Sequence, residues 1–467
     1  MGLRIYKTED KDRFIMNLTY GQLLKTNRNF RNLLWGQFVS ELGNWFNFIA
    51  GLGLVRLVSD ASPMAAGILF VCRLLPFALF SPIAGTFVDR FSRRRVMITS
   101  DLVRVAVALA FLFVSSKENL WIAYFATVLL STFGAFFEGA KNAATPNLTG
   151  KDGLLAGTAL MFSTRFLLMA VGSALGGWAA AIFGYKVAFI INAASFLVSA
   201  FSIWLIPEEA TRESNTKIQE LENAVPPQPA TAAGGFSPAA NQSEVKRESF
   251  FNELKEGLHY TANNYFALTI LLMNIIWATG GGAINVVFER MGGIVFSQKE
   301  NLNADLAVAL LWTAAGFGLF IGMMIAHRVS TFLDAKNLNN SFIGWTLLVH
   351  GILFAFAGFM PTLWLFMIFT FVSRAIVGVE YAVQETMFQR SLPDYIRGRI
   401  STLDRGAEIT MFSLSSYFAS LAMYRISPET LTMISGLLSA SAGVLWFARM
   451  RSKRAERYGR KEVLNDA

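Results

Sequence analysis

The chain has 467 residues, of which 54% are hydrophobic and 16% are charged, and its mean hydropathy is +0.43. Soluble domains carry about a quarter charged residues, so this composition excludes one large soluble core. The net charge of +9 raises nucleic-acid binding as a possible function. The basic residues gather at the ends of apolar segments, where membrane topology places them, and this excludes a nucleic-acid partner.

Apolar stretches of 18 or more residues recur along the whole chain. Each is long enough to cross a hydrocarbon core of about 30 Å as a helix. Lipid offers no hydrogen-bond partner to a bare backbone, and the runs lack the alternation of barrel strands, so we predict an all-α membrane protein. The twelve predicted spans are 32–57, 64–88, 96–116, 120–143, 154–183, 185–206, 265–293, 304–328, 340–359, 362–388, 403–424 and 428–449.

A polar segment divides the spans into two groups of six. Within it, residues 225–240 are rich in Pro, Ala and Gly, which predicts a flexible linker. The following segment, 250–258, has the pattern of a short amphipathic helix at a membrane surface. The predicted parts are a cytoplasmic N-terminal segment (1–31), a six-helix bundle (32–206), a cytoplasmic linker (207–262), a second six-helix bundle (263–450) and a basic cytoplasmic tail (451–467).

A weak internal repeat supports this division. Glu138 is followed eight residues later by Pro146 at the end of the fourth span, and Glu385 precedes Pro393 by the same spacing after the tenth. We therefore expect two pseudo-symmetric bundles related by an axis along the membrane normal, an arrangement typical of secondary transporters.

The basic residues predict the orientation of the chain. Of the 41 Lys and Arg residues, thirty lie in the segments on the same side as the linker and both termini, five lie in loops on the opposite side, and six lie inside spans. This asymmetry predicts a multi-pass protein of the plasma (inner) membrane with both termini in the cytoplasm.

The loop between the second and third spans reads GTFVDRFSRRR, residues 85–95. It resembles the signature Gly-x-x-x-Asp-Arg-x-Gly-Arg-Arg-Arg/Lys of the major facilitator superfamily, with Ser92 at the position of the second glycine. Gly85 would let two helices approach closely, and Asp89 would face the positive end of a helix from the other half. The resemblance implies the major facilitator fold and a conformational latch, which we assign to Gly85, Asp89, Arg90, Arg93, Arg94, Asp101 and Arg104.

Three further segments resemble the branch that contains macrolide-efflux proteins, enterobactin exporters and lysophospholipid transporters. They are 30–43 at the entry to the first span, 392–400 after the tenth span, and GSALGG at 172–177 in the fifth. The last resembles a degraded antiporter element, although its glycines can equally serve close helix packing.

Charged residues at mid-depth predict the transport pathway, because a charge in the hydrocarbon core is costly. Three arginines against one glutamate would favour an anionic or zwitterionic amphiphile, and Glu41 is the candidate proton carrier. The alternative is that these groups are structural, as for Glu138, Glu380, Glu385 and Glu408 nearer the cytoplasm. The predicted pathway comprises Glu41, Asn44, Arg73, Arg165, Asn274, His350 and Arg374.

The sequence predicts no cofactor and no metal site. Cys72 is the one cysteine, the three histidines are scattered, and no phosphate-binding loop of the Walker type occurs. We predict a monomeric secondary transporter, not an enzyme, that exports an amphipathic small molecule in exchange for protons and contacts membrane lipids. Two alternatives remain open: a lysophospholipid transporter without proton coupling, and a sensor or scaffold that transports nothing.

Overall fold

The computed structural model describes residues 18–88, 90–211 and 250–450, and in these ranges every regular element is helical. Predicted features within 1–17, 212–249 and 451–467 lie outside the described residues. The N-terminal bundle contains α1 (Tyr20–Thr26), α2 (Arg28–Val58), α3 (Pro63–Val88), α4 (Arg93–Ala110), α5 (Leu120–Phe183), α6 (Tyr185–Trp204) and the short turns η1 (Phe111–Phe113), η2 (Lys117–Asn119) and η3 (Glu209–Thr211).

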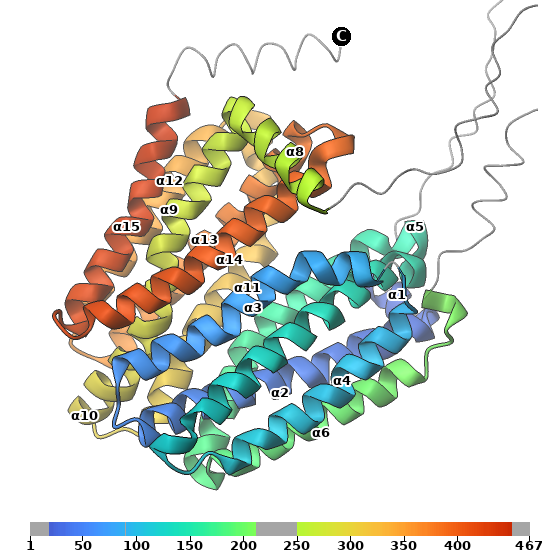
Figure 1. The fold of residues 1–467 in the computed structure, drawn as a ribbon. Coiled ribbons are helices and arrows are strands. Elements are labelled where there is room, and N and C mark those ends of the chain that lie inside the picture. Colours follow the sequence, from blue (N-terminus) through green and yellow to red (C-terminus); the bar gives the residue numbers. More distant parts are fainter. Residues whose placement is uncertain (1–17, 89, 212–249, 451–467) are drawn as a thin grey trace, which may run out of the picture.

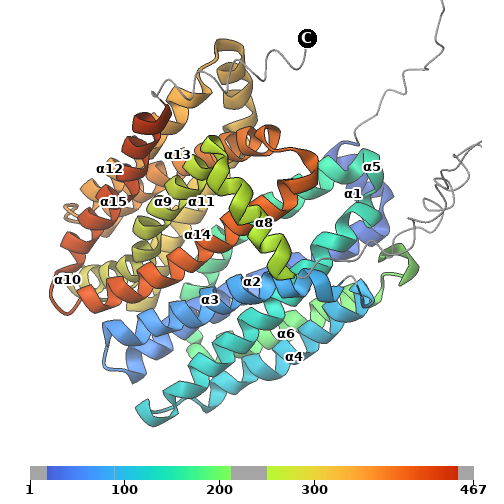
Figure 2. The same cartoon turned by 45° about the horizontal axis from the view of Figure 1, so that its top comes forward.

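The C-terminal bundle follows α8 (Phe250–Asn263), which contains the segment expected to form an amphipathic helix and packs on α14 and α9. Its remaining elements are α9 (Tyr265–Arg290), η4 (Met291–Phe296), α10 (Ser297–Lys299), α11 (Ala304–Lys336), α12 (Asn339–Ala357), α13 (Leu363–Ser391), α14 (Asp394–Ala422) and α15 (Pro428–Met450). Figures 1 and 2 show the two bundles side by side, with α3 against α14 and α5 against α11 where they meet.

Among the residues that the structure describes, ten helices are long and apolar enough to cross a membrane, and they match ten of the twelve predicted spans. The other two predicted spans fall in α2 and α14, which are 31 and 29 residues long but more polar. The all-α membrane fold is confirmed. The count of twelve stays a prediction for these two helices.

Polar side chains begin several of the helices. Asn27 accepts a hydrogen bond from the backbone N–H of Phe30 at 2.9 Å and starts α2, and Asn303 does the same for Leu306 at 3.1 Å in α11. The fourth and fifth predicted spans join in the single long element α5. Gly150 bends it with φ of +67°, a conformation that glycine adopts without steric cost.

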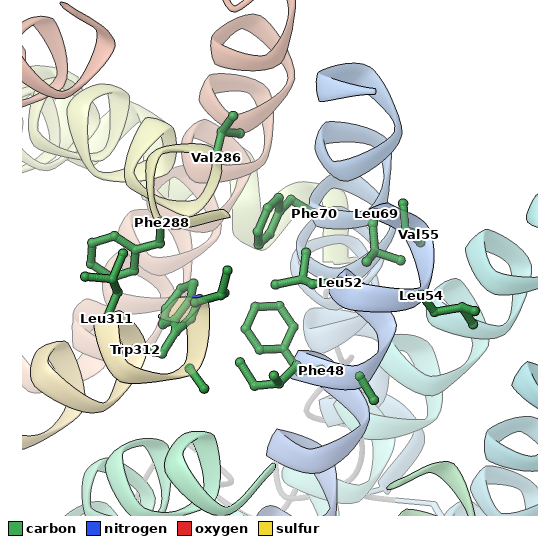
Figure 3. Close-up of a cluster of buried hydrophobic side chains, with 14 of the residues drawn as sticks. Phe48, Leu52, Leu54, Val55, Leu69, Phe70, Val286, Phe288, Leu311 and Trp312 are labelled. Atoms are coloured by element: carbon green, nitrogen blue, oxygen red, sulfur yellow. The ribbon is translucent and has the colours of Figure 1, made fainter. Parts of the chain in front are cut away.

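The apolar core differs between the two ends of the molecule. We call the end where α6 finishes and α8 begins the linker end, and the opposite end the far end. At the far end one cluster contains buried residues from both bundles, including Phe48, Phe70, Phe288 and Trp312 (Figure 3). At the linker end each bundle has a separate cluster, one around Phe30 and the other around Trp446.

Candidate functional site

An acidic pocket lies in the C-terminal bundle between α9, α13 and α14. Its volume is about 180 Å³. Three carboxylates in or beside it are at least nine-tenths buried: Glu380 is 3% exposed, and Asp404 and Glu408 are each 8% exposed. Its other lining residues are Asn274, Trp277, Leu347, Tyr381, Gln384, Glu385, Phe388, Ser401 and Arg405.

Amide side chains organise one wall of this pocket. The Asn274 side-chain nitrogen donates a hydrogen bond to Asp404 Oδ2 at 2.8 Å, and its oxygen accepts one from Gln384 at 3.0 Å. Asn274, on the predicted pathway, is thus brought into contact with Asp404, which the sequence prediction missed. The contacts link α9, α13 and α14 through polar groups.

One base faces the three carboxylates. Arg405 donates to Glu408 Oε2 at 3.0 Å and to the Tyr381 hydroxyl at 2.9 Å, and its side chain is 48% exposed. Glu380 Oε1 and Asp404 Oδ1 are buried and have no hydrogen-bond partner among the described residues. The pocket therefore holds two buried carboxyl oxygens that no described side chain binds.

The pocket lies near mid-depth. At ~1.5 Å per helical residue, Asn274 and Asp404 lie roughly 14–15 Å from the linker ends of α9 and α14, and Glu380 lies roughly 16 Å from that end of α13. A buried charge at this depth is costly, and such residues mark ion and substrate pathways.

The N-terminal bundle holds a second polar group at comparable depth. Asn44 donates a hydrogen bond to Glu41 at 3.3 Å, both on α2. Arg73 on α3 is within electrostatic range of Glu41 and Arg165, and its guanidinium lies 4.2 Å from the centre of the Phe48 ring. Four predicted pathway residues are therefore neighbours.

Arg165 on α5 is exposed although it lies far from either end of its helix. It is also within electrostatic range of Glu138, on the preceding part of α5.

Two further acids inside the N-terminal bundle, one fully buried and one partly buried, have local bases. Arg104 donates to Asp101, with Asp101 fully buried, and its guanidinium lies between the rings of Phe137 and Phe196 at 4.6 and 4.4 Å. The Lys141 ammonium lies 2.7 Å from Glu138 Oε1. Asp101 and Arg104, predicted as latch residues, thus form a pair inside this bundle.

His350 and Arg374 lie inside the C-terminal bundle and do not line the acidic pocket. They are 3% and 9% exposed, and Arg374 is 5.8 Å from the centre of the Phe354 ring. The Cβ atom of Arg374 packs close to Gly318 on α11. In this structure, Arg374 faces neighbouring helices of its own bundle and is separate from Arg73 and Arg165.

Aromatic rings from both bundles meet at the far end. The Trp312 ring lies 5.7 Å from that of Trp45, 5.2 Å from that of Phe48 and 5.2 Å from that of Phe288, measured between ring centres. Figure 3 shows Trp312 and Phe48 pointing toward one another across the boundary between the bundles. This contact excludes water between α2 and α11.

A polar cluster closes the far end beyond these rings. Arg56 of α2 pairs with Glu289 of α9 at 3.3 Å and with Asp305 of α11, and Tyr185 donates to Asp305 at 2.9 Å. Glu289 and Asp305 are buried, and the Arg56 side chain is only 11% exposed. These contacts connect the two bundles.

The signature loop makes a different set of contacts. Arg93 and Arg94 donate to the backbone oxygens of Thr211 and Trp204 at 3.2 and 2.6 Å, so they hold the segment after α6 within the same bundle. Arg90 is exposed, and Asp89 lies outside the described residues. The latch function of this loop stays a prediction.

Gly85 corrects one expectation about this loop. A Cβ atom added at Gly85 would meet no atom within 4 Å, so close helix approach does not require glycine there in this structure. The glycines of the fifth span behave differently. Cβ atoms at Gly172 and Gly176 would collide with α2, and one at Gly177 would collide with Ala309 of the other bundle.

The sequence prediction missed Asp404 and Arg405, and it treated Arg56 only as a topology signal. Asp404 is the second residue of the predicted span 403–424, which placed it at the membrane surface. Helix α14 begins at Asp394, so Asp404 is ten residues deep. A search for carboxylates one helical turn apart would have found Asp404 and Glu408.

Comparisons with known proteins agree with the fold. The profile of the Major Facilitator Superfamily matches residues 33–338. The MFS-type transporter YfiS of Bacillus subtilis (strain 168) is 22% identical over 438 residues, covering 93% of this chain and 96% of the relative. Macrolide efflux protein A of Enterococcus faecalis is 21% identical over 359 residues, covering 75% of this chain and 94% of the relative. The crystal structure of a bacterial homologue of the human lysosomal transporter Spinster has a TM-score of 0.63 at 13% identity, covering 91% of this chain and 98% of that one.

Proposed function

Because the chain belongs to the Major Facilitator Superfamily, we propose that it is a secondary transporter of the plasma membrane that exports an amphipathic small molecule by alternating access. The chain is a multi-pass membrane transporter of this superfamily. Export is supported by the similarity to macrolide efflux protein A.

Alternating access is supported by the unequal packing of the two bundles at the two ends of the molecule. The bundles share one aromatic cluster and the Arg56 ion pairs at the far end, whereas their apolar cores are separate at the linker end. A transporter that rocks about a central site needs one end closed while the other can part.

The distribution of basic residues assigns the linker end to the cytoplasm in this proposal. The described conformation is then closed to the outside and ready to receive a substrate from the cytoplasm. The exporter would move to the opposite state by separating Arg56 from Glu289 and Asp305.

Proton coupling is proposed on carboxylates inside the two bundles. Glu41 is near Arg73, so its protonation would weaken that attraction and change the balance of charge between α2 and α3. Glu380 and Asp404 offer further oxygen atoms without hydrogen-bond partners among the described residues. The proton gradient is the energy source that this arrangement suits.

Arg73 and Arg165 support the predicted preference for an anionic or zwitterionic group in the N-terminal bundle. Guanidinium groups bind carboxylates and phosphates strongly. The same chemistry is compatible with the alternative of a lysophospholipid transporter, because a lysophospholipid carries a phosphate group next to its acyl chain. A substrate screen separates these classes.

Cross-linking tests alternating access. The hydroxyl oxygens of Ser62 and Tyr424 lie 3.2 Å apart at the far end, one in each bundle. In a Cys72→Ser background, Ser62→Cys with Tyr424→Cys should be bridged by a short bis-methanethiosulfonate reagent, which replaces the length lost with the tyrosine ring; the bridge should stop transport, and reduction should restore it. Full transport by the cross-linked protein would contradict the rocking mechanism.

A thermal-shift screen of the purified protein at several pH values tests the substrate class. One panel holds anionic amphiphiles, including lysophospholipids and catechol siderophores, and the other holds cationic drugs and macrolides. Hits are then followed by accumulation assays in efflux-deficient cells, with and without a protonophore. Accumulation that is unchanged by the transporter for every hit would contradict export.

A further inference from the structure

We propose that the acidic pocket of the C-terminal bundle binds the ammonium group of an amphipathic amine. The inference deepens the proposed function by naming the chemical group that the exporter recognises. It concerns Glu380, Asp404 and Glu408 together with the aromatic rings around them.

The charge balance is the first argument. Three carboxylates, each at least nine-tenths buried, face a single guanidinium, that of Arg405. Arg405 binds Glu408 and the Tyr381 hydroxyl, which leaves Glu380 Oε1 and Asp404 Oδ1 without hydrogen-bond partners among the described residues. Buried carboxylate oxygens need a compensating cation or donor, and an ammonium group supplies both.

The ring lining is the second argument. Trp277, Tyr381 and Phe388 line the pocket beside the carboxylates. Cations bind favourably over the faces of such rings. The Arg405 guanidinium already lies 5.7 Å from the centre of the Tyr381 ring, so this ring accepts a cation in the present structure.

Size and position complete the argument. The part of the pocket beside Asp404, Arg405 and Glu408 has a volume of about 180 Å³, which is enough for an amine head group. The apolar part of the ligand would extend outside the pocket. Metal binding is not favoured, since no group of three metal-ligating side chains occurs among the described residues.

The test uses a matched pair of fluorescent probes with the full-length protein in lipid nanodiscs. Dansylcadaverine carries a primary ammonium group, and N-acetyl dansylcadaverine has a closely similar size without the charge. Fluorescence anisotropy should give at least tenfold tighter binding of the amine, a difference of about 1.4 kcal/mol. Equal affinity for the two probes would overturn the proposal.

Variants locate the site. Glu380→Gln with Asp404→Asn should remove the preference for the amine. Asp334→Asn is the matched control, because Asp334 lies on α11 of the same bundle, is 41% exposed and pairs with Arg390 at 3.6 Å. It makes the same type of charge change and should bind both probes as the unmodified protein does.

A gain of affinity separates this mechanism from misfolding. Arg405→Gln removes the resident cation, so the amine should bind several-fold more tightly. Unchanged or weaker amine binding by a variant that elutes as a single species would overturn the proposal. Because these measurements are of binding, loss of export with intact amine preference would count against the proposed function alone.

Discussion

The acidic side chains inside the two bundles have different partners. In the N-terminal bundle, Asp101 and Glu138 each have a base one turn along the same helix, Arg104 and Lys141 respectively. In the C-terminal bundle, Glu408 pairs with Arg405, whereas Glu380 and Asp404 have no base within ion-pair distance among the described residues. Buried pairs can be structural, whereas uncompensated buried charge is retained at a cost in stability. The difference supports the proposed binding of a ligand by acidic groups of the C-terminal bundle.

The largest effect on stability is expected when a base is removed from the N-terminal bundle. Arg104→Ala should leave Asp101 buried and unpaired, which costs ~3–5 kcal/mol, and should lower the midpoint of thermal unfolding sharply. The double variant Asp101→Ala with Arg104→Ala should recover part of the loss. A midpoint equal to that of the unmodified protein would show that the pair is not structural.

In the C-terminal bundle, a substitution at a buried acid is expected to raise the stability of the protein instead of lowering it. Glu380→Gln removes a buried carboxyl group whose Oε1 atom has no partner among the described residues, so it should stabilise the protein by roughly 1–3 kcal/mol. Glu138→Gln is the matched control, because it leaves the buried Lys141 ammonium unpaired and should destabilise. Thermal unfolding in one detergent compares the two variants. Destabilisation of similar size in both would remove the distinction between the bundles.

A third prediction concerns the contact between the bundles. Arg56→Ala leaves Glu289 and Asp305 without this cation at the far end, so the closed state should lose at least about tenfold in population, or ~1.4 kcal/mol. The rate of cross-linking between cysteines at positions 62 and 424 measures this. Lys299→Ala, which removes an exposed base from the same end, should leave the rate unchanged. Equal rates in both variants would assign the closure to the aromatic cluster alone.

The smallest effect is expected in the signature loop. Arg95 pairs with Glu208 at 3.2 Å, but its side chain is 75% exposed. Solvent screens such a pair, so Arg95→Ala should change the free energy of unfolding by less than about 1 kcal/mol. If the loop acts as a latch, the same variant should alter the transport rate without altering the unfolding midpoint. A large loss of stability would instead make this loop part of the fold.

The depth of a side chain in the membrane is predictable from sequence, whereas its direction is not. Depth follows from counting residues along a helix, so the sequence alone identifies Glu41, Arg73 and Arg165 as mid-depth charges. Counting does not give the direction in which a side chain points. Arg374 therefore meets the same criterion, yet it packs among α11 and α12 inside its own bundle.

Hydropathy also limited how well the sequence predicted the positions of charged residues in the membrane. The polar first nine residues of α14 lie before the predicted span, which placed Asp404 at the apparent membrane surface although it is ten residues from the start of the helix. Glu289 and Asp305 lie near span ends and were indistinguishable from ordinary surface charges. Only their placement beside Arg56, which is more than 230 positions away in sequence, identifies a closing cluster.

The sequence by itself determined the all-helical membrane fold, the positions of ten spans and the superfamily, because lipid forces apolar length and internal backbone hydrogen bonding on any spanning segment. The tertiary structure decided which charges are paired, which face a pocket and which end of the molecule is closed. Those properties depend on the rotation of each helix about its axis and on contacts between bundles, and single-chain periodicity encodes neither.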